Sequence, residues 1–254
     1  MTAELISVGT EILMGNILNS NTQYLAEKCA MLGFNMYHQV TVGDNYGRMK
    51  EVVATAVSRA DIVILTGGLG PTEDDLTKEV CAEVMGMELV EDPHTRQHIE
   101  EFFHNNIYRE IPANNWKMTT VPRGARVLDN HNGMAPGLIL EKEGRTAILL
   151  PGPPGELYPM FEQQVFPYLE TRENASLVSK TLKICGHGES QVEDQLIDLI
   201  DGQTNPTLAT YAKVGEVHLR ITARADETGK AAALVEPVAA EVKRRMGDAV
   251  YTED

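Results

Sequence analysis

Short apolar runs alternate with longer amphipathic segments along the first third of the chain. The runs cover 5–8, 36–42 and 61–66, and they are rich in the β-branched residues and Leu that buried parallel strands favour. Between them, apolar side chains recur at helical spacing after Asn19 and again over Tyr46–Ser58. Strands that alternate with helices predict βαβ units around a mostly parallel sheet, so we expect the α/β fold class.

The middle of the chain carries a weaker pattern. Prolines and polar residues predict an irregular segment over 111–127, and the Glu143-Gly144 pair predicts a tight hairpin. The elements expected here are a helix over 93–106, strands over 138–140 and 146–150, and a helix that follows the 151–156 turn and ends near Glu170.

A polar stretch at 171–176 separates this region from a second pattern. We place a domain boundary there, which divides the chain into domains of 1–171 and 172–254. The second domain is predicted as a small α+β module with a polar C-terminal end. Its expected elements are strands over 179–185, 207–213 and 216–223 and helices over 189–200 and 228–246.

Composition narrows the function classes. The 254 residues are 43% hydrophobic and carry a formal net charge of −15, which argues against a nucleic-acid partner, because phosphate binding needs clustered Lys and Arg. Cys29, Cys81 and Cys185 are far apart and fit no disulfide or zinc spacing, so we expect buried thiols in a reducing compartment. We also expect no membrane partner and a cytoplasmic location, because no apolar run is long enough to span a bilayer.

The central motif is TGGLGPTEDDLT, at Thr66–Thr77, between the third predicted strand and a helix. Gly67, Gly68 and Gly70 permit unusual dihedrals and close backbone approach. Exposed N–H groups in such a turn, together with the following helix N-terminus, form a site for an anion such as a phosphate. We therefore expect a phosphate cradle in this loop.

The same loop carries Glu73, Asp74 and Asp75. Three carboxylates beside a phosphate cradle are understandable if a divalent metal ion bridges them to the ligand. The alternative is a structural Gly/Pro turn in which Asp75 caps the next helix, an interpretation that explains one carboxylate and not three.

Further carboxylates follow the other predicted strands. Turns begin at Gly9 and Gly43 as well as in the Thr66–Thr77 loop, and Glu11 and Asp44 lie in those turns. Because parallel strands end at the same edge of a sheet, we expect these carboxylates to converge with those of the loop. Asp44 can also cap the helix that follows it.

Several motifs together carry a resemblance to known families. Thr66–Thr72, with Asp75 and Thr77, resembles the signature of molybdopterin-binding domains of the MoaB/MogA/MoeA kind. The closer resemblance is to the CinA family of competence/damage-inducible proteins. It rests on Gly9–Leu13 with Gly15, Asn19 and Asn21, on Asn132–Gly137, on Leu150–Pro154 with Glu156, and on Gly186–Ser190. Leu69 and Met134 stand where Thr is common in the pterin-domain pattern, and Met118 stands where Gln is common.

The resemblance implies a three-layer molybdopterin-binding-like domain followed by a small KH-like module. It also implies that the C-terminal amidohydrolase domain of many relatives is absent. The activity associated with the N-terminal part of the family is metal-dependent hydrolysis of ADP-ribose to AMP and ribose 5-phosphate, with Mg²⁺, Mn²⁺ or Co²⁺ as cofactor. A homodimer is expected as well. The alternatives are a molybdopterin- or nucleotide-binding module and a dimerisation platform of a longer protein.

Under this hypothesis the catalytic residues are Asp75, Asp44 and Glu11, and the metal ligands are Glu11, Asp44, Asp74 and Asp75. The expected partner is a small nucleotide. The residues predicted to bind it are Gly9, Thr10, Thr66, Gly67, Gly68, Gly70, Pro71, Thr72, Thr77, Asn132, Gly133, Pro151, Gly152, Pro153 and Glu156.

Overall fold

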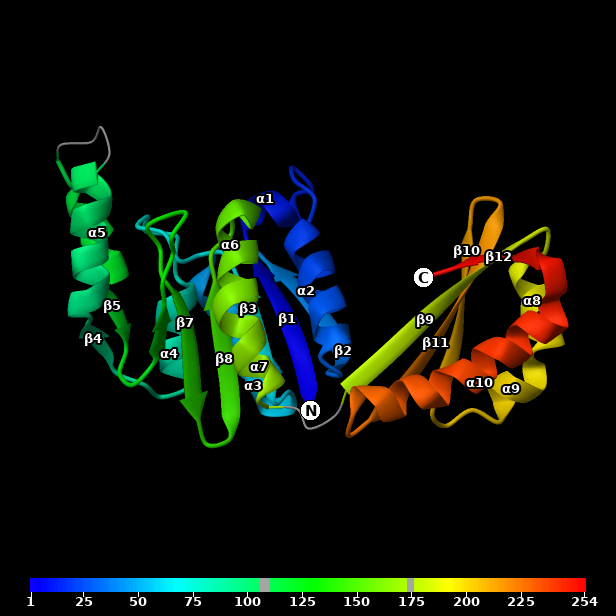
Figure 1. Cartoon of the computed structure of the whole chain (residues 1–254). Helices are drawn as coiled ribbons and strands as arrows, with labels where there is room; N and C mark the ends of the chain where they lie inside the picture. Colours follow the sequence, from blue (N-terminus) through cyan, green and yellow to red (C-terminus); the bar gives the residue numbers. More distant parts are fainter. Residues whose placement is uncertain (106–109, 173–175) are drawn as a thin grey trace. The chain divides into compact units, whose positions relative to one another are not determined.

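The computed structural model describes residues 1–105, 110–172 and 176–254, which form two compact units (Figure 1). Unit 1 comprises residues 1–30 and 34–172, and unit 2 comprises residues 31–33 and 173–254. Across the described residues, no helix combines the length and apolar character needed to cross a bilayer.

Unit 1 is built on a six-stranded sheet in the order β2-β1-β3-β8-β7-β6. The strands are β1 (Thr2–Val8), β2 (Asn35–Val42), β3 (Ile62–Thr66), β6 (Arg126–Leu128), β7 (Gly137–Lys142) and β8 (Arg145–Leu150). β1 is parallel to β2 and β3, and β3 is parallel to β8, whereas β7 and β6 run antiparallel. The mostly parallel sheet predicted from the apolar runs is therefore confirmed.

Helices cover both faces of this sheet (Figure 1). The helices of unit 1 are α1 (Thr10–Leu13), α2 (Ser20–Met31), α3 (Tyr46–Arg59), α4 (Thr77–Val84), α5 (Pro93–Asn105), α6 (Pro154–Met160) and α7 (Phe166–Glu170), with one π-helical segment, η2 (Phe161–Val165), between the last two. α5 packs against η1 rather than against the sheet. α5 matches the predicted helix except for Asn106, which lies outside the described residues.

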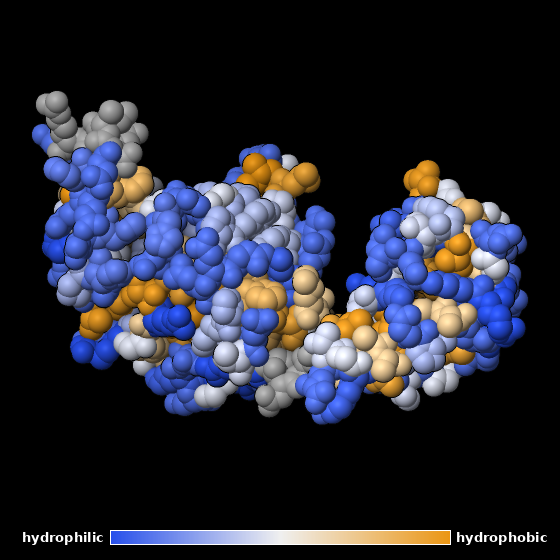
Figure 2. All heavy atoms as spheres, viewed as in Figure 1, coloured by the Kyte–Doolittle hydropathy of each residue, from blue (hydrophilic) through white to orange (hydrophobic). Residues whose placement is uncertain are grey.

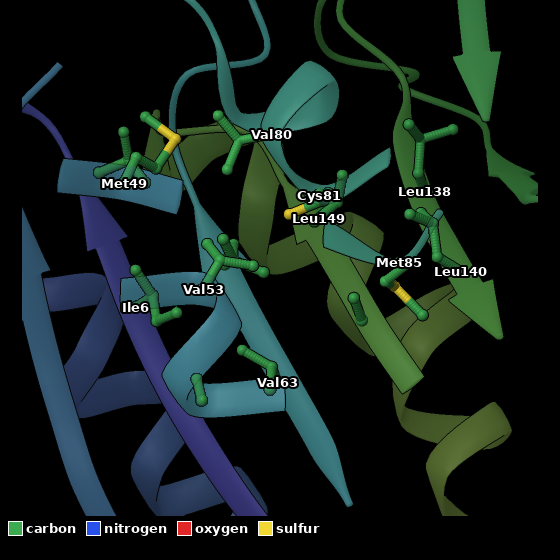
Figure 3. Packing of buried hydrophobic residues seen from close by; sticks show 14 of the residues in the cluster. Ile6, Met49, Val53, Val63, Val80, Cys81, Met85, Leu138, Leu140 and Leu149 are labelled. Carbon is green, nitrogen blue, oxygen red and sulfur yellow. The ribbon is translucent and has the colours of Figure 1, made fainter. Parts of the chain in front are cut away.

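The strand residues alternate between two buried faces. Val63 and Leu65 of β3 belong to the cluster that α3 and α4 cover, shown in Figure 3. Ile62 and Ile64 point the other way, and each is at most 1% exposed. Burial on both faces explains why the run is continuously apolar and contains no alternating polar positions.

The segment 111–127 is more ordered than predicted. It contains η1 (Ala113–Thr119), a 3₁₀ helix, and β5 (Thr120–Pro122), which pairs with β4 (Leu89–Glu91). Arg126 and Val127 begin β6. Short strands of this kind are specified by their pairing partner, and three residues carry too little periodicity to reveal them.

Unit 2 has a four-stranded sheet in the order β10-β11-β9-β12 and a core of its own. The C-terminal end, for which no element was predicted, contains a strand: residues 250–253 form β12, which pairs antiparallel with β9. The elements are β9 (Ser176–Cys185), α8 (Glu189–Gln195), α9 (Ile197–Asp201), β10 (Thr207–Lys213), β11 (Glu216–Ala225), α10 (Thr228–Met246), η3 (Gly247–Ala249) and β12 (Val250–Glu253).

Two local predictions also need correction. Asn45, not Asp44, caps α3, because its side-chain oxygen accepts the Arg48 N–H at 3.1 Å. Cys185 is exposed, whereas Cys29 and Cys81 are buried as expected. Burial raises the pKa of the Cys29 thiol to about 12, which keeps it protonated near neutral pH.

Candidate functional site

A cleft of about 550 Å³ opens at the carboxyl ends of β1, β3 and β8. This is the edge at which open α/β sheets bind their ligands. Every lining residue belongs to unit 1. The lining comprises Val8, Gly9, Glu11, Ile12, Ile17–Asn21, Asp44, Thr66–Thr72, Asp74, Asp75, Met118, Met134, Ala135, Pro151–Pro154 and Glu156.

The glycines of the β3–α4 loop are required by the packing of the protein itself. Gly67 and Gly68 have φ angles of 92° and 68°, a region that side chains disfavour. A Cβ atom on Gly67 would lie 2.4 Å from the Val8 carbonyl oxygen, and one on Gly68 would lie 2.2 Å from the Thr77 hydroxyl. The loop therefore folds tightly onto β1 and α4 and carries its backbone to the floor of the cleft.

The backbone N–H groups of the loop divide into two sets. The Gly67 N–H donates to the Leu150 carbonyl at 3.0 Å, so it does not serve as the predicted phosphate donor. Among the described residues, the N–H groups of Gly68, Leu69 and Gly70 have no acceptor. These three consecutive donors are the part of the loop that can hold an anion.

Asp75 closes the loop rather than capping α4. Its carboxylate accepts the Thr72 N–H at 2.9 Å and the Thr72 hydroxyl at 2.6 Å. The N-cap position of α4 is occupied by Leu76, whose side chain has no capping oxygen, so the helix-cap interpretation of Asp75 is wrong. The charge of Asp75 is consequently held at the cleft by a local turn.

Asp74 shares the same hydroxyl. Its carboxylate lies 2.5 Å from the Thr72 Oγ1 atom, so a single hydroxyl proton serves two neighbouring carboxylates. This hydrogen bond holds the pKa of the Asp74 carboxyl below its ordinary value, and Lys117 contributes in the same direction. Asp74 is therefore anionic at neutral pH.

Lys117 and Lys78 contact the main chain of the acidic loop, residues 71–76, or of the segment next to it. The Lys117 ammonium donates to the carbonyls of Thr72 at 2.7 Å and of Asp75 at 2.5 Å. Lys78 is only 6% exposed and donates to the Lys117 carbonyl at 2.7 Å. Burial lowers the pKa of the Lys78 ammonium, with Glu79 opposing that shift. The two lysines bind the main chain and leave the loop carboxylates directed to the cleft.

Asp44 and Glu11 lie on the opposite wall. The Asp44 carboxylate accepts the Thr10 N–H at 2.8 Å, and the Asp44 N–H donates to the Thr10 hydroxyl at 3.2 Å, which ties the β1 and β2 turns together. The described residues contain no group of three or more His, Cys, Asp or Glu side chains arranged to hold a metal ion. The four carboxylates thus share one cleft without forming a preassembled cage.

The structure brings together most of the predicted site residues but not all. Four of them lie outside the cleft lining: Thr10, Thr77, Asn132 and Gly133. The Thr77 hydroxyl is buried and donates to the Gly67 carbonyl at 2.7 Å, and the Asn132 amide donates to the Gly155 carbonyl at 2.9 Å. Gly133 packs against Glu156, since a Cβ atom there would lie 2.2 Å from its carboxylate. These residues support the walls.

Several lining residues were not predicted. Asn21 lies in the first turn of α2 and is 7% exposed, and its Nδ2 atom donates to the Gly152 carbonyl at 2.7 Å. Leu69, Met118 and Met134 form an apolar part of the lining. The sequence did contain a signal for this apolar lining. At each of the three positions an apolar side chain stands where the pterin-domain pattern commonly has a polar one.

An apolar rim adjoins the cleft. Figure 2 shows an apolar patch over α1 and the loop that follows it. The exposed hydrophobic side chains in this stretch are Leu13, Met14, Ile17 and Leu18. Ile17 and Leu18 line the cleft as well, so its mouth is apolar on the side away from the acidic loop.

This fold and this cleft define a molybdopterin-binding-type α/β domain. A family model described as "Probable molybdopterin binding domain" matches residues 4–171, and one described as "Damage-inducible protein CinA KH domain" matches residues 179–252. The chain belongs to the CinA family.

The relatives agree with that assignment. A competence-damage inducible protein of Clostridium beijerinckii is 51% identical over the whole chain, and a CinA-like protein of Dictyoglomus turgidum is 49% identical. The chain covers 62% and 61% of the lengths of these two relatives. A crystal structure of a CinA protein of unknown function from Thermoplasma acidophilum matches with a TM-score of 0.60 and 30% identity, over 64% of this chain and 95% of that one.

Proposed function

We propose that unit 1 hydrolyses the diphosphate of ADP-ribose with the help of a divalent cation, giving AMP and ribose 5-phosphate. The observation that carries this proposal is that one cleft contains both the backbone N–H groups of Gly68–Gly70, which have no acceptor among the described residues, and the carboxylates of Asp74 and Asp75. Donors alone suit any anion, whereas donors beside carboxylates suit an anion that arrives with a metal ion.

The chain's own groups divide the work. The Gly68–Gly70 N–H groups bind phosphoryl oxygens, and Asp75 accepts the proton of the attacking water as general base. Water adds to one phosphorus atom while the bridging P–O bond breaks, and the leaving phosphate carries the released electron pair. The apolar side chains of Leu69, Met118 and Met134 exclude bulk water from one side of the diphosphate.

The carboxylates of the cleft fit a divalent cation that is held jointly by the protein and by the diphosphate of the ligand. Mg²⁺ in such sites takes one or two carboxylates and completes its shell with phosphate oxygens and water. Asp74 and Asp75 both reach the Thr72 hydroxyl, so their oxygens lie close enough to share one ion, and Glu11 and Asp44 line the same cleft. A bound Mg²⁺, Mn²⁺ or Co²⁺ would neutralise charge and lower the pKa of a coordinated water.

The test is AMP release from ADP-ribose by the purified chain with each of the three metals. Asp75→Asn keeps an oxygen for the Thr72 N–H and removes the charge, so we expect folding to survive and turnover to fall roughly 100-fold or more. Glu73→Gln is the matched control, since Glu73 belongs to the same loop and lies outside the cleft lining. Equal turnover in wild type and Asp75→Asn would refute the assignment, as would inactivity of the wild type with every metal.

The description of the matched family supports a second candidate, binding of molybdopterin or its adenylated form. The same N–H groups would hold its phosphate, and the apolar lining would contact its ring system. Calorimetry with molybdopterin and with ADP-ribose separates the two candidates. Tighter binding of the pterin, without AMP release, would favour the second. The third candidate is a dimerisation platform of a longer protein. Size-exclusion chromatography with light scattering tests whether the chain forms the homodimer that this candidate requires.

A further inference from the structure

Two polar side chains in the cleft are buried without hydrogen-bond partners. The Asn21 Oδ1 and Thr66 Oγ1 atoms have none among the described residues, and the two residues are 7% and 3% exposed. Both line the cleft, Asn21 from the first turn of α2 and Thr66 from the end of β3. A buried polar atom without a partner costs free energy, so each such atom calls for a partner from outside the protein chain, and in a cleft that partner can be a ligand group.

The orientation of the Asn21 amide follows from its one hydrogen bond. A main-chain carbonyl can only accept, so the atom that lies 2.7 Å from the Gly152 oxygen must be the NH₂ group. That bond leaves the Oδ1 atom as a fixed acceptor. A fixed acceptor selects a ligand group that donates an O–H or N–H, and phosphoryl oxygens at neutral pH donate neither.

The neighbouring Asn19 provides the contrast. Its Oδ1 atom accepts from the Thr22 N–H at 3.3 Å and the Thr22 hydroxyl at 2.9 Å, and its Nδ2 atom donates to the Ser7 hydroxyl at 2.9 Å. Asn19 is therefore satisfied inside the protein, as the cap of α2. Asn21, two residues further along the chain, has the same type of side chain, but its Oδ1 acceptor has no partner among the described residues.

We propose that Asn21, supported by Thr66, forms a specificity subsite that reads a hydrogen-bond donor of the ligand's sugar or base. The proposal rests on the proposed function, because it takes a nucleoside diphosphate sugar as the ligand. It divides the cleft into an acidic end, where Gly68–Gly70 and Asp75 hold the diphosphate, and a polar floor, where Asn21 accepts a ribose hydroxyl or the exocyclic amine of adenine.

The test compares kcat/KM for ADP-ribose with that for analogues that each lack one donor. The panel comprises analogues without single ribose hydroxyls and the hypoxanthine analogue, which lacks the amine. For wild type we expect one analogue to fall roughly 10- to 100-fold below ADP-ribose, because its binding leaves the acceptor unpaired. The identity of that analogue tells whether sugar or base supplies the donor.

In Asn21→Ala the ratio between ADP-ribose and that analogue should collapse towards one, because the group that discriminates has gone. Asn19→Ala should destabilise the fold through loss of the cap and keep the wild-type ratio. A purely structural role for Asn21 would lower turnover of all substrates together and leave the ratio unchanged, which would overturn the proposal. Wild type that turns over every analogue equally would overturn it too.

Two provisions keep the outcomes separate. If Asn21→Ala fails to fold, Asn21→Ser replaces it, since Ser keeps a polar group in the buried site but is too short to place an acceptor where Oδ1 lies. If wild type releases no AMP with any metal, the proposed hydrolysis fails. The same panel is then measured by calorimetry, where equal affinities for ADP-ribose and all analogues would refute the subsite on its own.

Discussion

Thr66 and Thr77 stand at the two ends of the Gly-rich loop, and both are buried, with exposures of 3% and 0%. They differ in what their hydroxyls meet. The Thr77 hydroxyl donates to the Gly67 carbonyl at 2.7 Å, whereas the Thr66 hydroxyl has no partner in the described parts of the chain. One threonine therefore serves the fold, and the other is available to a ligand.

Thr66→Val and Thr77→Val should consequently change stability in opposite directions. Val keeps the shape of Thr, so replacing the unpartnered hydroxyl should raise the free energy of unfolding by about 1 kcal/mol. Thr77→Val removes the bonded hydroxyl and leaves the Gly67 carbonyl without its donor, so the free energy of unfolding should fall by about 1–2 kcal/mol. Urea unfolding of the two variants beside wild type measures both. Destabilisation by Thr66→Val would mean that its hydroxyl is satisfied in the free protein.

Asp61 gives a prediction for pH. Its carboxylate accepts the Thr2 N–H at 2.8 Å and the Thr2 hydroxyl at 3.0 Å, and these bonds, with Arg145 nearby, hold its pKa below the ordinary 3.8. A pKa lowered by folding means that the stabilisation is present above pH 3.8 and is lost as the pH falls through the folded-state value.

Asp61→Asn should therefore lower stability at pH 7, and the gap to wild type should narrow in acid. The side chain is 38% exposed, so solvent screening keeps the gap below about 1 kcal/mol. Thermal unfolding of both proteins between neutral and acid pH measures it. A gap that widens in acid would contradict the assigned sign.

Among the elements, the acidic loop at 71–76 depends on a contact from another part of the chain. Lys117, from η1, donates to the carbonyls of Thr72 and Asp75 and thereby joins two segments that are remote in sequence. Because Lys117 donates to carbonyls, it fixes the loop without forming a hydrogen bond to the Asp74 or Asp75 carboxylate.

Lys117→Met should loosen this loop while leaving the sheet intact. We expect the hydrogen-bonded amides of Thr72 and Asp75 to exchange with solvent at least tenfold faster, because about 1.4 kcal/mol of stabilisation corresponds to a factor of ten. Lys142→Met is the control, since Lys142 also donates to a carbonyl, that of Gly86, at 2.8 Å, but outside the cleft. Unchanged exchange in Lys117→Met would show that the turn closed by Asp75 suffices.

The regular elements of this fold were predictable where local pattern and tertiary structure agree. The run at 62–66 is apolar on both faces, and the Glu143-Gly144 pair has φ angles of 51° and 78°, as a two-residue hairpin requires. The helix predicted over 228–246 has those bounds in the structure. In each case the signal lies within one continuous segment of the chain.

The site was less predictable because its details depend on contacts between distant residues. That the carboxylates share one cleft could be expected from the parallel strands. That the Gly67 N–H donates to the Leu150 carbonyl could not, because it depends on the pairing of β3 with β8. The contact of Lys117 with the loop spans more than forty positions in the sequence. The role of Asp75 turned on whether α4 begins at Leu76 or later, and helix boundaries are the least certain feature of a sequence pattern.

On the scale of the whole chain, the cleft belongs to unit 1. All of its lining residues lie between Val8 and Glu156, and unit 2 has a separate sheet and a separate apolar cluster. Each unit thus meets the ordinary requirement for independent folding, a core of its own.

A fragment of residues 1–172 should accordingly unfold in one cooperative transition and retain the AMP release proposed for the full chain. Circular dichroism on heating tests the first part, and the ADP-ribose assay tests the second, with Asp75→Asn in the same fragment as the inactive control. A fragment that is folded but inactive would show that the reaction requires residues beyond 172.

The strand β12 has a consequence for the behaviour of unit 2 in solution. Its pairing with β9, continued by two 2.9 Å hydrogen bonds between Asp254 and Thr181, occupies the outer side of β9 from Thr181 to Ile184. Without these last residues, β9 would present a row of open N–H and C=O groups to any neighbouring molecule. Val250, Tyr251 and Thr252, which are residue types that favour strands, thus protect this edge against aggregation. Removing residues 250–254 should lower the solubility of unit 2 and leave unchanged the cleft residues, all of which belong to unit 1.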